Sequence, residues 1–369
     1  MFLKTVMERN QPLVRLGIEW QQNGVILPDT YLLDYDTILE NARSIKQAGD
    51  ANGVQNFFML KQIGRNPLIA RALTDMGYVG AVCVDFREAL TMVENQIPLG
   101  NVGHLVQIPR AALKKILRAK PVIVTVYTLE KAREISAVCT ELGLHQKLML
   151  RVLGEGDMLY SGQYGGFELQ ELDSAVRAIE AMPNVEVGGV CSFPCFLYDE
   201  AAQDILPMPN LRTVQTAAEM LRARGYRDLM LNTPSATCTH SIPMIAAAGG
   251  THGEPGHGLT GTTPYHAGHP DAEERPGYLY VSEVSHNLGD KAYCYGGGHY
   301  RRGHMKNALV GTTPENAKVV PVLPPDDSSI DYHFELQQNC PVSAAAVMAF
   351  RTQSVSYTHL RAHETAANL

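Results

Sequence analysis

Lys61 is the first residue whose position indicates chemistry. It follows an apolar run, residues 57–60, and precedes Gly64 and a helix start at Asn66-Pro67. Apolar surroundings disfavour a protonated amine, and the neutral amine can attack a carbonyl carbon. A strand-end lysine that extends into solvent is the more ordinary arrangement when the residue is taken alone. Lys61 is therefore a candidate nucleophile whose role depends on its neighbours.

A second reactive segment is 251–261, in which Glu254 is followed by Pro255, Gly256 and His257. A carboxylate can keep a ring nitrogen protonated, and backbone N–H groups beside glycine can approach a phosphate. Proline and glycine in this order also build ordinary turns. A turn and a binding site are compatible here, so the segment predicts a site for an anionic or heteroaromatic ligand.

A third segment is 231–237, where Ser235 lies among small hydroxyl residues between a strand end and a helix start. Backbone N–H groups and a hydroxyl at a helix N-terminus can bind phosphate. Taken alone, this segment is explained about equally well as an N-cap that binds no ligand.

The elements that must position these residues alternate between strand and helix. Short β-branched or apolar runs predict strands at 56–60, 79–84, 102–106, 122–127, 148–152, 185–191 and 229–232, with a weak eighth just before 252–255. Amphipathic patterns predict helices at 66–76, 110–118, 129–142, 172–182, 213–223 and 242–248. About eight such units favour an α/β fold, a (β/α)8 TIM barrel over residues 28–264. A doubly wound open sheet is the alternative, because periodicity does not show closure.

The composition changes after Pro264, where glycine, proline, histidine and tyrosine become frequent. Strand patterns at 278–285, 292–295 and 344–350 predict a smaller all-β domain over 265–353, which the segment 1–27 could join. Residues 354–369 resemble a translated sequencing adapter, so we expect a non-native tail on a truncated domain, and we assign its His359 and His363 no role.

Bulk properties exclude several classes of protein. The 369 residues carry a net charge of −7 without a basic cluster, so we expect no nucleic-acid partner. The apolar runs are too short for a membrane span, and the N-terminus does not resemble a secretion signal. Seven irregularly spaced cysteines favour a reduced, cytoplasmic protein.

The order of the three reactive segments resembles fold-type III enzymes that depend on pyridoxal 5'-phosphate (PLP), such as alanine racemase and ornithine decarboxylase. Segment 251–261 is similar to the Glu-Pro-Gly-Arg stretch of the decarboxylases. Segments 30–41, 80–89 and 187–193 are similar to the family's opening strand and helix, its second strand and helix, and the strand under the pyridine ring. Residues 293–299 resemble a Cys-Asp-Gly stretch that the decarboxylases offer across a dimer. The whole chain looks most similar to YhfX-type members.

The resemblance implies a PLP site in the barrel. Lys61 would form the Schiff base and transfer a proton, and Glu254 would bind the pyridine nitrogen. Gly256, with Ser235 and His257, would bind the phosphate. Because a carboxylate holds the ring nitrogen protonated, the ring can accept the electrons of a carbanion.

Two further roles follow from the resemblance. Phe193 takes the position of a racemase histidine and could stack on the pyridine ring. Cys294 or Tyr293 would reach the active site of a neighbouring subunit in a homodimer and act as a second acid or base.

These features predict a PLP-dependent isomerase, an amino-acid racemase or epimerase acting through a Lys61 Schiff base and a quinonoid-like carbanion. Decarboxylation and aldol cleavage of a D-amino acid share that carbanion and stay open. Glu254 replaces the racemase arginine on the ring nitrogen, which argues against a plain alanine racemase. A non-catalytic PLP-binding regulator is the alternative from another class; the added β domain argues against it.

Metal binding is the remaining alternative. Histidines flank Glu254 and the Arg301-Arg302 pair, and cysteines lie nearby, but no H-E-x-x-H or C-x-x-C spacing occurs. We therefore expect no metal. A metal-dependent barrel hydrolase would need more histidine and aspartate at strand ends. The residues considered as metal ligands are His252, His257, His299, His304, Cys294 and Cys340. The strand ends considered for the hydrolase offer Lys61, Asp85, His104 and Glu254.

Overall fold

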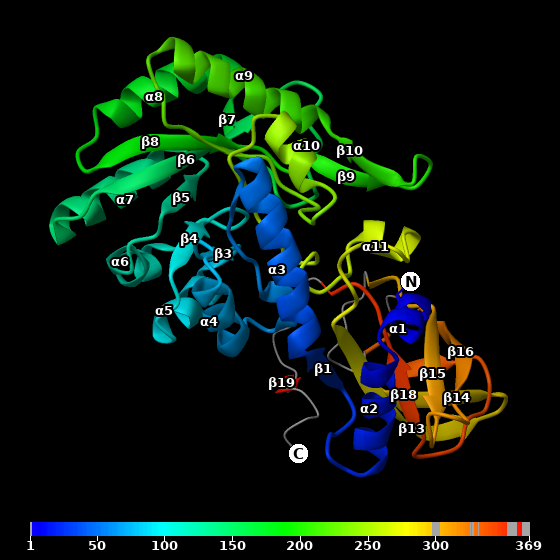
Figure 1. Ribbon diagram of the computed structural model, residues 1–369. Coiled ribbons are helices and arrows are strands. Elements are labelled where there is room, and N and C mark those ends of the chain that lie inside the picture. Colours follow the sequence, from blue (N-terminus) through cyan, green and yellow to red (C-terminus); the bar gives the residue numbers. More distant parts are fainter. Residues whose placement is uncertain are drawn as a thin grey trace. The chain divides into compact units, whose positions relative to one another are not determined.

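The structure is a computed structural model that describes residues 2–296, 303–324, 326, 328–330 and 332–352, and the backbone of 360–363. The chain forms two compact units, coloured by sequence in Figure 1. The barrel unit comprises Arg43–Leu60 and Pro67–Gly256, and the β unit comprises Met1–Ala42, Lys61–Asn66 and His257–Leu369. No helix in the described ranges is long and apolar enough to cross a membrane.

Parallel strands form the barrel unit, which is described without a gap. Their order is β2 (Gln55–Asn56), β12 (His252–Gly253), β11 (Met230–Asn232), β8 (Val185–Cys191), β6 (Gln146–Leu153), β5 (Ile123–Val126), β4 (Leu99–Val102) and β3 (Ala81–Cys83). The chain at Phe58 joins the two ends, because Phe58 N donates to Gly80 O at 3.1 Å and Val82 N donates to Phe58 O at 2.7 Å. The expected eight-stranded barrel is confirmed, and the open-sheet alternative is wrong.

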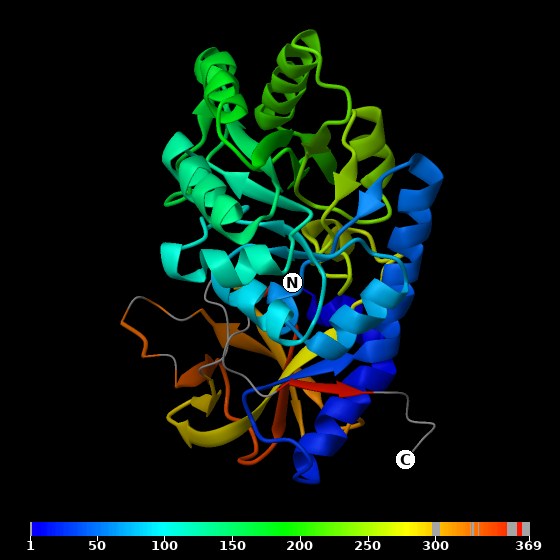
Figure 2. The same ribbon diagram turned by 90° about the vertical axis from the view of Figure 1, so that its left-hand side faces the viewer.

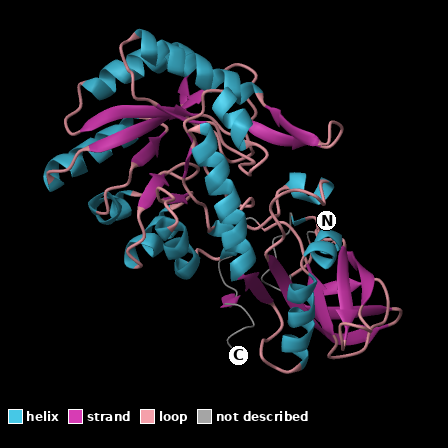
Figure 3. Cartoon of the chain, viewed as in Figure 1, coloured by secondary structure: helices cyan, strands magenta, loops and turns pink. Residues whose placement is uncertain are grey.

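Helices surround these strands, as Figure 3 shows in cyan around magenta. They are α4 (Pro67–Asp75), α5 (Phe86–Glu94), α6 (Arg110–Arg118), α7 (Leu129–Leu142), α8 (Leu172–Glu180), α9 (Pro209–Ala223) and α10 (Ile242–Ala247). Side-chain caps fix where some of them begin: Asp85 accepts from Glu88 N, and Thr128 accepts from Lys131 N. Short extra pieces are η1 (Lys61–Ile63), η2 (Leu169–Glu171), β7 (Phe167–Glu168) and a hairpin of β9 (Phe196–Asp199) with β10 (Asp204–Pro207).

One strand prediction was wrong in position. The run 102–106 was expected to be a strand, whereas β4 is Leu99–Val102 and the chain turns at Gly103, whose φ is +90°. Gly100 permits the earlier start, because a Cβ there would lie 2.5 Å from the Phe57 ring. The shift brings Asn101 into the strand.

The β unit contains a closed antiparallel barrel of six described strands. Going around it, β13 (Tyr278–Leu288) pairs with β14 (Lys291–Tyr295), then follow β17 (His333–Leu336), β16 (Lys318–Leu323), β15 (Asn307–Gly311) and β18 (Ala345–Met348), which pairs with β13 again. β1 (Thr30–Asp34), from the range predicted for the parallel barrel, instead pairs with β13. The backbone of β19 (Leu360–His363) lies parallel to β1.

Two N-terminal helices, α1 (Leu3–Arg9) and α2 (Gln11–Gln22), pack on this antiparallel sheet (Figure 2). Asn10 joins them: its side chain accepts from Leu13 N and donates to Asp34 Oδ2 at 2.8 Å. One apolar cluster includes Val6 and Ile18 of the helices and Leu279, Val281 and Val347 of the sheet. After these helices and β1, α3 (Tyr35–Asn52) runs from the β unit into the barrel unit.

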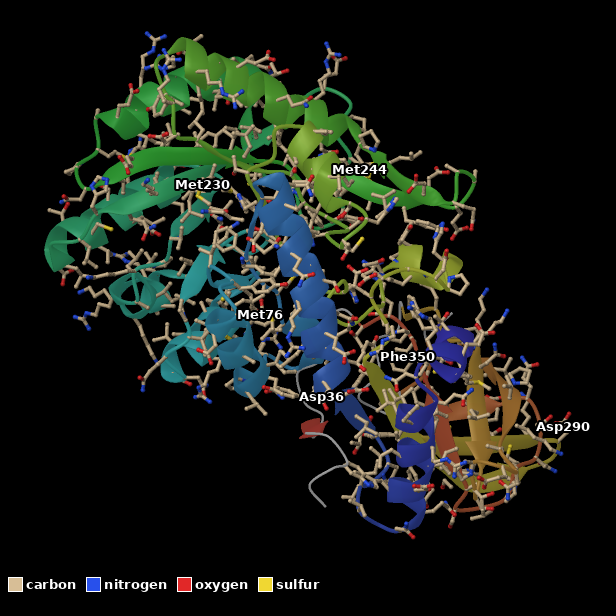
Figure 4. All side chains as sticks on the ribbon, viewed as in Figure 1. Asp36, Met76, Met230, Met244, Asp290 and Phe350 are labelled. Atoms are coloured by element: carbon tan, nitrogen blue, oxygen red, sulfur yellow. The ribbon has the colours of Figure 1, made fainter. Side chains whose placement is uncertain are left out.

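Aromatic rings fill the β unit near the end of β18. Phe350, labelled in Figure 4, lies with its ring centroid 5.4 Å from Tyr280 and 6.2 Å from Tyr31, and the Tyr278 hydroxyl donates to Phe350 O. Buried aromatic pairs of this kind add to the stability gained from burial. The packing fixes the backbone that leads to Arg351 and Thr352.

Ile18 is fully buried in the helix–sheet cluster, so we predict that Ile18→Ala lowers the free energy of unfolding by about 2–5 kcal/mol. Leu288 is 70% exposed at the end of β13, and Leu288→Ala should change it by less than about 0.5 kcal/mol. Urea denaturation of both variants measures the difference. Equal losses would contradict the packing of α2 on the sheet.

Candidate active site

The carboxylate of Glu254 lies buried inside the barrel unit, directly after β12. Its Oε1 accepts hydrogen bonds from Asn232 Nδ2 at 2.7 Å and Asn101 Nδ2 at 3.1 Å. Its backbone N donates to Thr237 Oγ1 at 3.3 Å. Three strands thus contribute to holding one side chain, since Asn101 is on β4 and Asn232 on β11.

A polar chain continues behind Asn101. The hydroxyl of Thr125, on β5, donates to Asn101 Oδ1 at 2.7 Å, so the amide NH2 faces Glu254. The apolar side chains of Ile123, Met149 and Cys191 form one buried cluster, and Met230 of β11, labelled in Figure 4, packs against it. Burial raises the pKa of the Cys191 thiol to about 12, so it is neutral.

His252, two residues before Glu254, is buried in the same interior. Its Nδ1 is 3.1 Å from Thr251 Oγ1, and its ring packs edge-on against Phe57 at 4.9 Å. Burial lowers the pKa of His252 to about 3, so the imidazole is neutral at physiological pH. Its Nε2 lies 3.9 Å from Glu254 Oε1, too far for a hydrogen bond.

Lys61 is the first residue of η1 and is 8% exposed. The chain before it lies beside the Glu254 segment: Phe57 N donates to Gly253 O at 3.0 Å, and Met59 N donates to Pro255 O at 2.9 Å. Lys61 follows two residues after Met59. Barrel catalytic groups characteristically occupy this carboxyl end of the strands.

Within the β unit, Lys61 belongs to a basic cluster with His257 and Arg351. Arg351 Nε donates to His257 Nε2 at 3.5 Å, and His257 Nδ1 is 3.2 Å from Thr262 Oγ1. Burial, then the charges of Arg351 and Lys61, lower the pKa of His257 well below its usual value. Thr352 donates to Gln62 O at 3.1 Å, next to Lys61 in the chain. These groups suit an anion such as a phosphate or carboxylate.

The structure places the remaining predicted cofactor residues as follows. Phe193 follows β8, with its ring 5.6 Å from His104 and 5.6 Å from Tyr160. Ser235 donates to Phe196 O at 2.7 Å, which joins the segments after β8 and β11. Gly256 is buried and directly precedes His257.

Cys294 and Tyr293, the two residues expected to reach a neighbouring subunit, lie on opposite faces of β14. Alternation along the strand turns Cys294 into the interior, where it is fully buried, and burial raises its thiol pKa to about 12. The role of Cys294 across a dimer stays a prediction. Tyr293 lies on the opposite face, half-buried and stacked on His286 at 4.9 Å, and stays a candidate.

Sequence reasoning missed Arg151, which is on β6 and only 1% exposed. Its Nη1 donates to Tyr127 Oη at 2.8 Å and its Nη2 donates to Gln163 O at 2.9 Å. Its guanidinium lies 4.8 Å from the centre of the Tyr127 ring. The missed signal was a charged residue inside the apolar run 148–153 of β6. Arg151 adds a permanent positive charge at the carboxyl end of the barrel strands.

The residues weighed for a metal site are only partly described. His299, Arg301, Arg302 and His359 lie outside the described residues, and so does the side chain of His363. Within the part of the chain that the structure describes, no three histidine, cysteine or acidic side chains are grouped to hold a metal ion.

A closed parallel (β/α)8 barrel unit and an antiparallel β-barrel unit in one chain define the class of PLP-dependent enzymes with the alanine racemase fold. The chain belongs to that family: residues 33–264 match the alanine racemase N-terminal domain, and residues 279–360 match the YhfX-like C-terminal domain. It is 42% identical to the uncharacterized protein YhfX of Escherichia coli K12 over 96% of this chain and 91% of that protein.

Solved structures share the fold at low sequence identity. A Clostridium difficile alanine racemase in complex with cycloserine matches with a TM-score of 0.63 and 14% identity, over 89% of this chain and 88% of the racemase. D-threonine aldolase from Filomicrobium marinum matches with a TM-score of 0.64 and 17% identity, over 88% of this chain and 86% of the aldolase. D-threo-3-hydroxyaspartate dehydratase from Delftia sp. HT23 matches with a TM-score of 0.63 and 14% identity, over 89% of this chain and 90% of the dehydratase. The same architecture thus occurs with three different activities.

The neutral, buried His252 predicts a specific loss of stability in acid. The unfolded imidazole gains a proton near pH 6.5 and the folded one near pH 3, so stability present above pH 6.5 is lost as the pH falls between these values. His252 alone should lower the free energy of unfolding by about 2 kcal/mol between pH 7 and pH 5. Urea denaturation at both pH values should show a smaller acid loss for His252→Gln than for the wild type.

His145, whose side chain is 54% exposed, provides the control. His145→Gln should keep the acid loss of the wild type. If His252→Gln keeps it as well, His252 does not stay neutral in the folded protein.

Proposed function

We propose that this protein binds PLP through Lys61 and acts on the α-carbon of an amino acid, as a racemase or epimerase. The observation that carries the proposal is the buried Glu254 carboxylate, oriented by Asn101 and Asn232 at the carboxyl end of the barrel strands. Membership of the alanine racemase family supports it.

The donor set around Glu254 fits the ring of PLP. A buried carboxylate needs hydrogen bonds and a cationic partner, and a protonated pyridine nitrogen is such a partner. The basic cluster of His257 and Arg351, after Gly256, fits a phosphate, and Ser235 is a further candidate. Phe193 offers an aromatic face for stacking, with Tyr160 and His104 around it.

PLP, when bound, withdraws electrons from the α-carbon of an attached amino acid. In the proposal, the Lys61 amine holds the cofactor until the substrate amine replaces it. Lys61 then removes or returns the α-proton on its side of the substrate. Glu254 keeps a proton on the ring nitrogen, and His252, being neutral, does not compete for that role.

Racemisation needs a second acid or base on the opposite face of the substrate. Tyr293 of a partner subunit is our candidate, which makes a homodimer part of the proposal. A cytoplasmic location is also part of it, since all seven cysteines are buried free thiols.

Cleavage of a bond to the α-carbon, by aldol cleavage or decarboxylation, is the second candidate. Glu254 favours it, because a protonated ring is a stronger electron acceptor than the unprotonated ring beside an arginine. The fold also occurs in a D-threonine aldolase.

The first test is the attachment of PLP. The wild type reconstituted with PLP should absorb visible light, and borohydride reduction should leave the cofactor on Lys61 in peptide mass spectra. Lys61→Ala should lose both signals, whereas Lys114→Ala on the surface of α6 should keep them. A colourless wild type, or a label on another lysine, refutes the proposal.

The second test separates the reactions. Amino acids of both hands in deuterated water should gain α-deuterium and interconvert, and Lys61→Ala should slow exchange by about 100-fold or more. Tyr293→Phe should keep exchange but lose inversion. Release of an aldehyde or of carbon dioxide instead supports the second candidate. PLP binding without any exchange indicates a non-catalytic binding protein.

A further inference from the structure

We propose that Asn101 and Asn232 are positioning residues that keep Glu254 ionised inside the barrel, and that Thr125 fixes the Asn101 amide in the orientation this requires. The inference rests on the proposed function, in which Glu254 pairs with the ring nitrogen of PLP. It adds three residues from β4, β5 and β11 to the machinery of that site.

The first observation is that both amides present the same kind of group to the same atom. Asn232 Nδ2 and Asn101 Nδ2 lie 2.7 Å and 3.1 Å from Glu254 Oε1. Asn101 is completely buried and Asn232 is 1% exposed, so bulk water does not compete with Glu254 for either amide. Hydrogen bonds donated to a carboxylate favour its charged form over the protonated acid.

The second observation is that His252, a further polar neighbour, brings no charge. Burial keeps His252 neutral, and its Nε2 is 3.9 Å from Oε1. Burial by itself favours the uncharged acid, which could not hold a proton on a ring nitrogen. The two amide donors oppose that effect of burial.

The third observation concerns direction. An asparagine amide can present either its oxygen or its nitrogen, and an oxygen facing Glu254 would repel the anion. The carboxylate, which only accepts, requires the NH2 group, and Thr125 holds the amide in that orientation because its hydroxyl donates to Asn101 Oδ1 at 2.7 Å. The Cys191 thiol of β8 also interacts with the Thr125 hydroxyl of β5. Through Asn101 of β4, this hydroxyl is connected to the Glu254 carboxylate.

A purely structural role would have a different signature. If the amides only fill the barrel, their loss lowers stability and leaves the titration of bound PLP unchanged. If they hold Glu254 ionised, their loss allows the acid to take up a proton at higher pH. Protonated Glu254 would no longer be the anionic partner of the ring nitrogen, so the absorption of the bound cofactor should change at that higher pH.

The test is a pH titration of the absorption of bound PLP in the wild type, Asn101→Leu, Asn232→Leu, Thr125→Val and Thr125→Ser. We expect the midpoint to rise by about one pH unit or more in each leucine variant. Thr125→Val should shift it in the same direction by less, and Thr125→Ser should restore the wild-type midpoint because it keeps the hydroxyl.

The melting temperature of each variant checks its folding. If Asn101→Leu does not fold, Asn101→Asp tests the same position. Aspartate keeps the size of the side chain and adds a second acid beside Glu254, so the midpoint should rise further. Asn52→Leu, at an exposed asparagine of α3 that donates to Ala48 O, is the matched control and should titrate like the wild type.

The outcomes separate this inference from the proposed function. A wild type that does not attach PLP through Lys61 refutes the proposed function, and with it this inference. A wild type that attaches PLP, with leucine and aspartate variants that fold and share its midpoint, refutes the positioning role alone.

Discussion

The charge of one buried carboxylate is the constraint on which the site depends. A carboxylate removed from water is unstable as an anion unless hydrogen bonds or a cation replace the lost hydration. Glu254 obtains two donors from strands that are far apart in the sequence, β4 and β11. Only a closed barrel brings both strands to the residue after β12, so the closure through Phe58 is also an electrostatic requirement.

The local parts of this arrangement could be predicted from the sequence. Lys61 after an apolar run and Glu254 in a Pro-Gly turn are each recognisable within ten residues, and the alternation of strands and helices predicts the barrel. Asn101 and Asn232 could not be found in this way, because each looks like an ordinary polar residue in a strand. Their meaning depends on register between strands, and the predicted β4 was itself displaced by the apolar pair Leu105 and Val106 after Gly103.

Arg151 and Cys294 show two other limits. A buried arginine in β6 contradicts the rule that charged residues avoid strands buried on both faces, and such an exception indicates a function or a strained site. A motif around Cys294 does not show which face of a strand each residue takes. The period of two along β14 places Tyr293 and Cys294 on opposite sides of the strand.

Each unit carries a different kind of charge. The barrel interior offers an acid held by neutral amides, which suits a group with a protonated nitrogen. The β unit carries the basic cluster of Lys61, His257 and Arg351, which suits an anionic group. In the proposed function, Glu254 would make the ring of the cofactor a strong electron acceptor for any bond to the α-carbon. The choice among the possible reactions would then fall to the acid and base groups around the substrate, outside the strands that hold the ring.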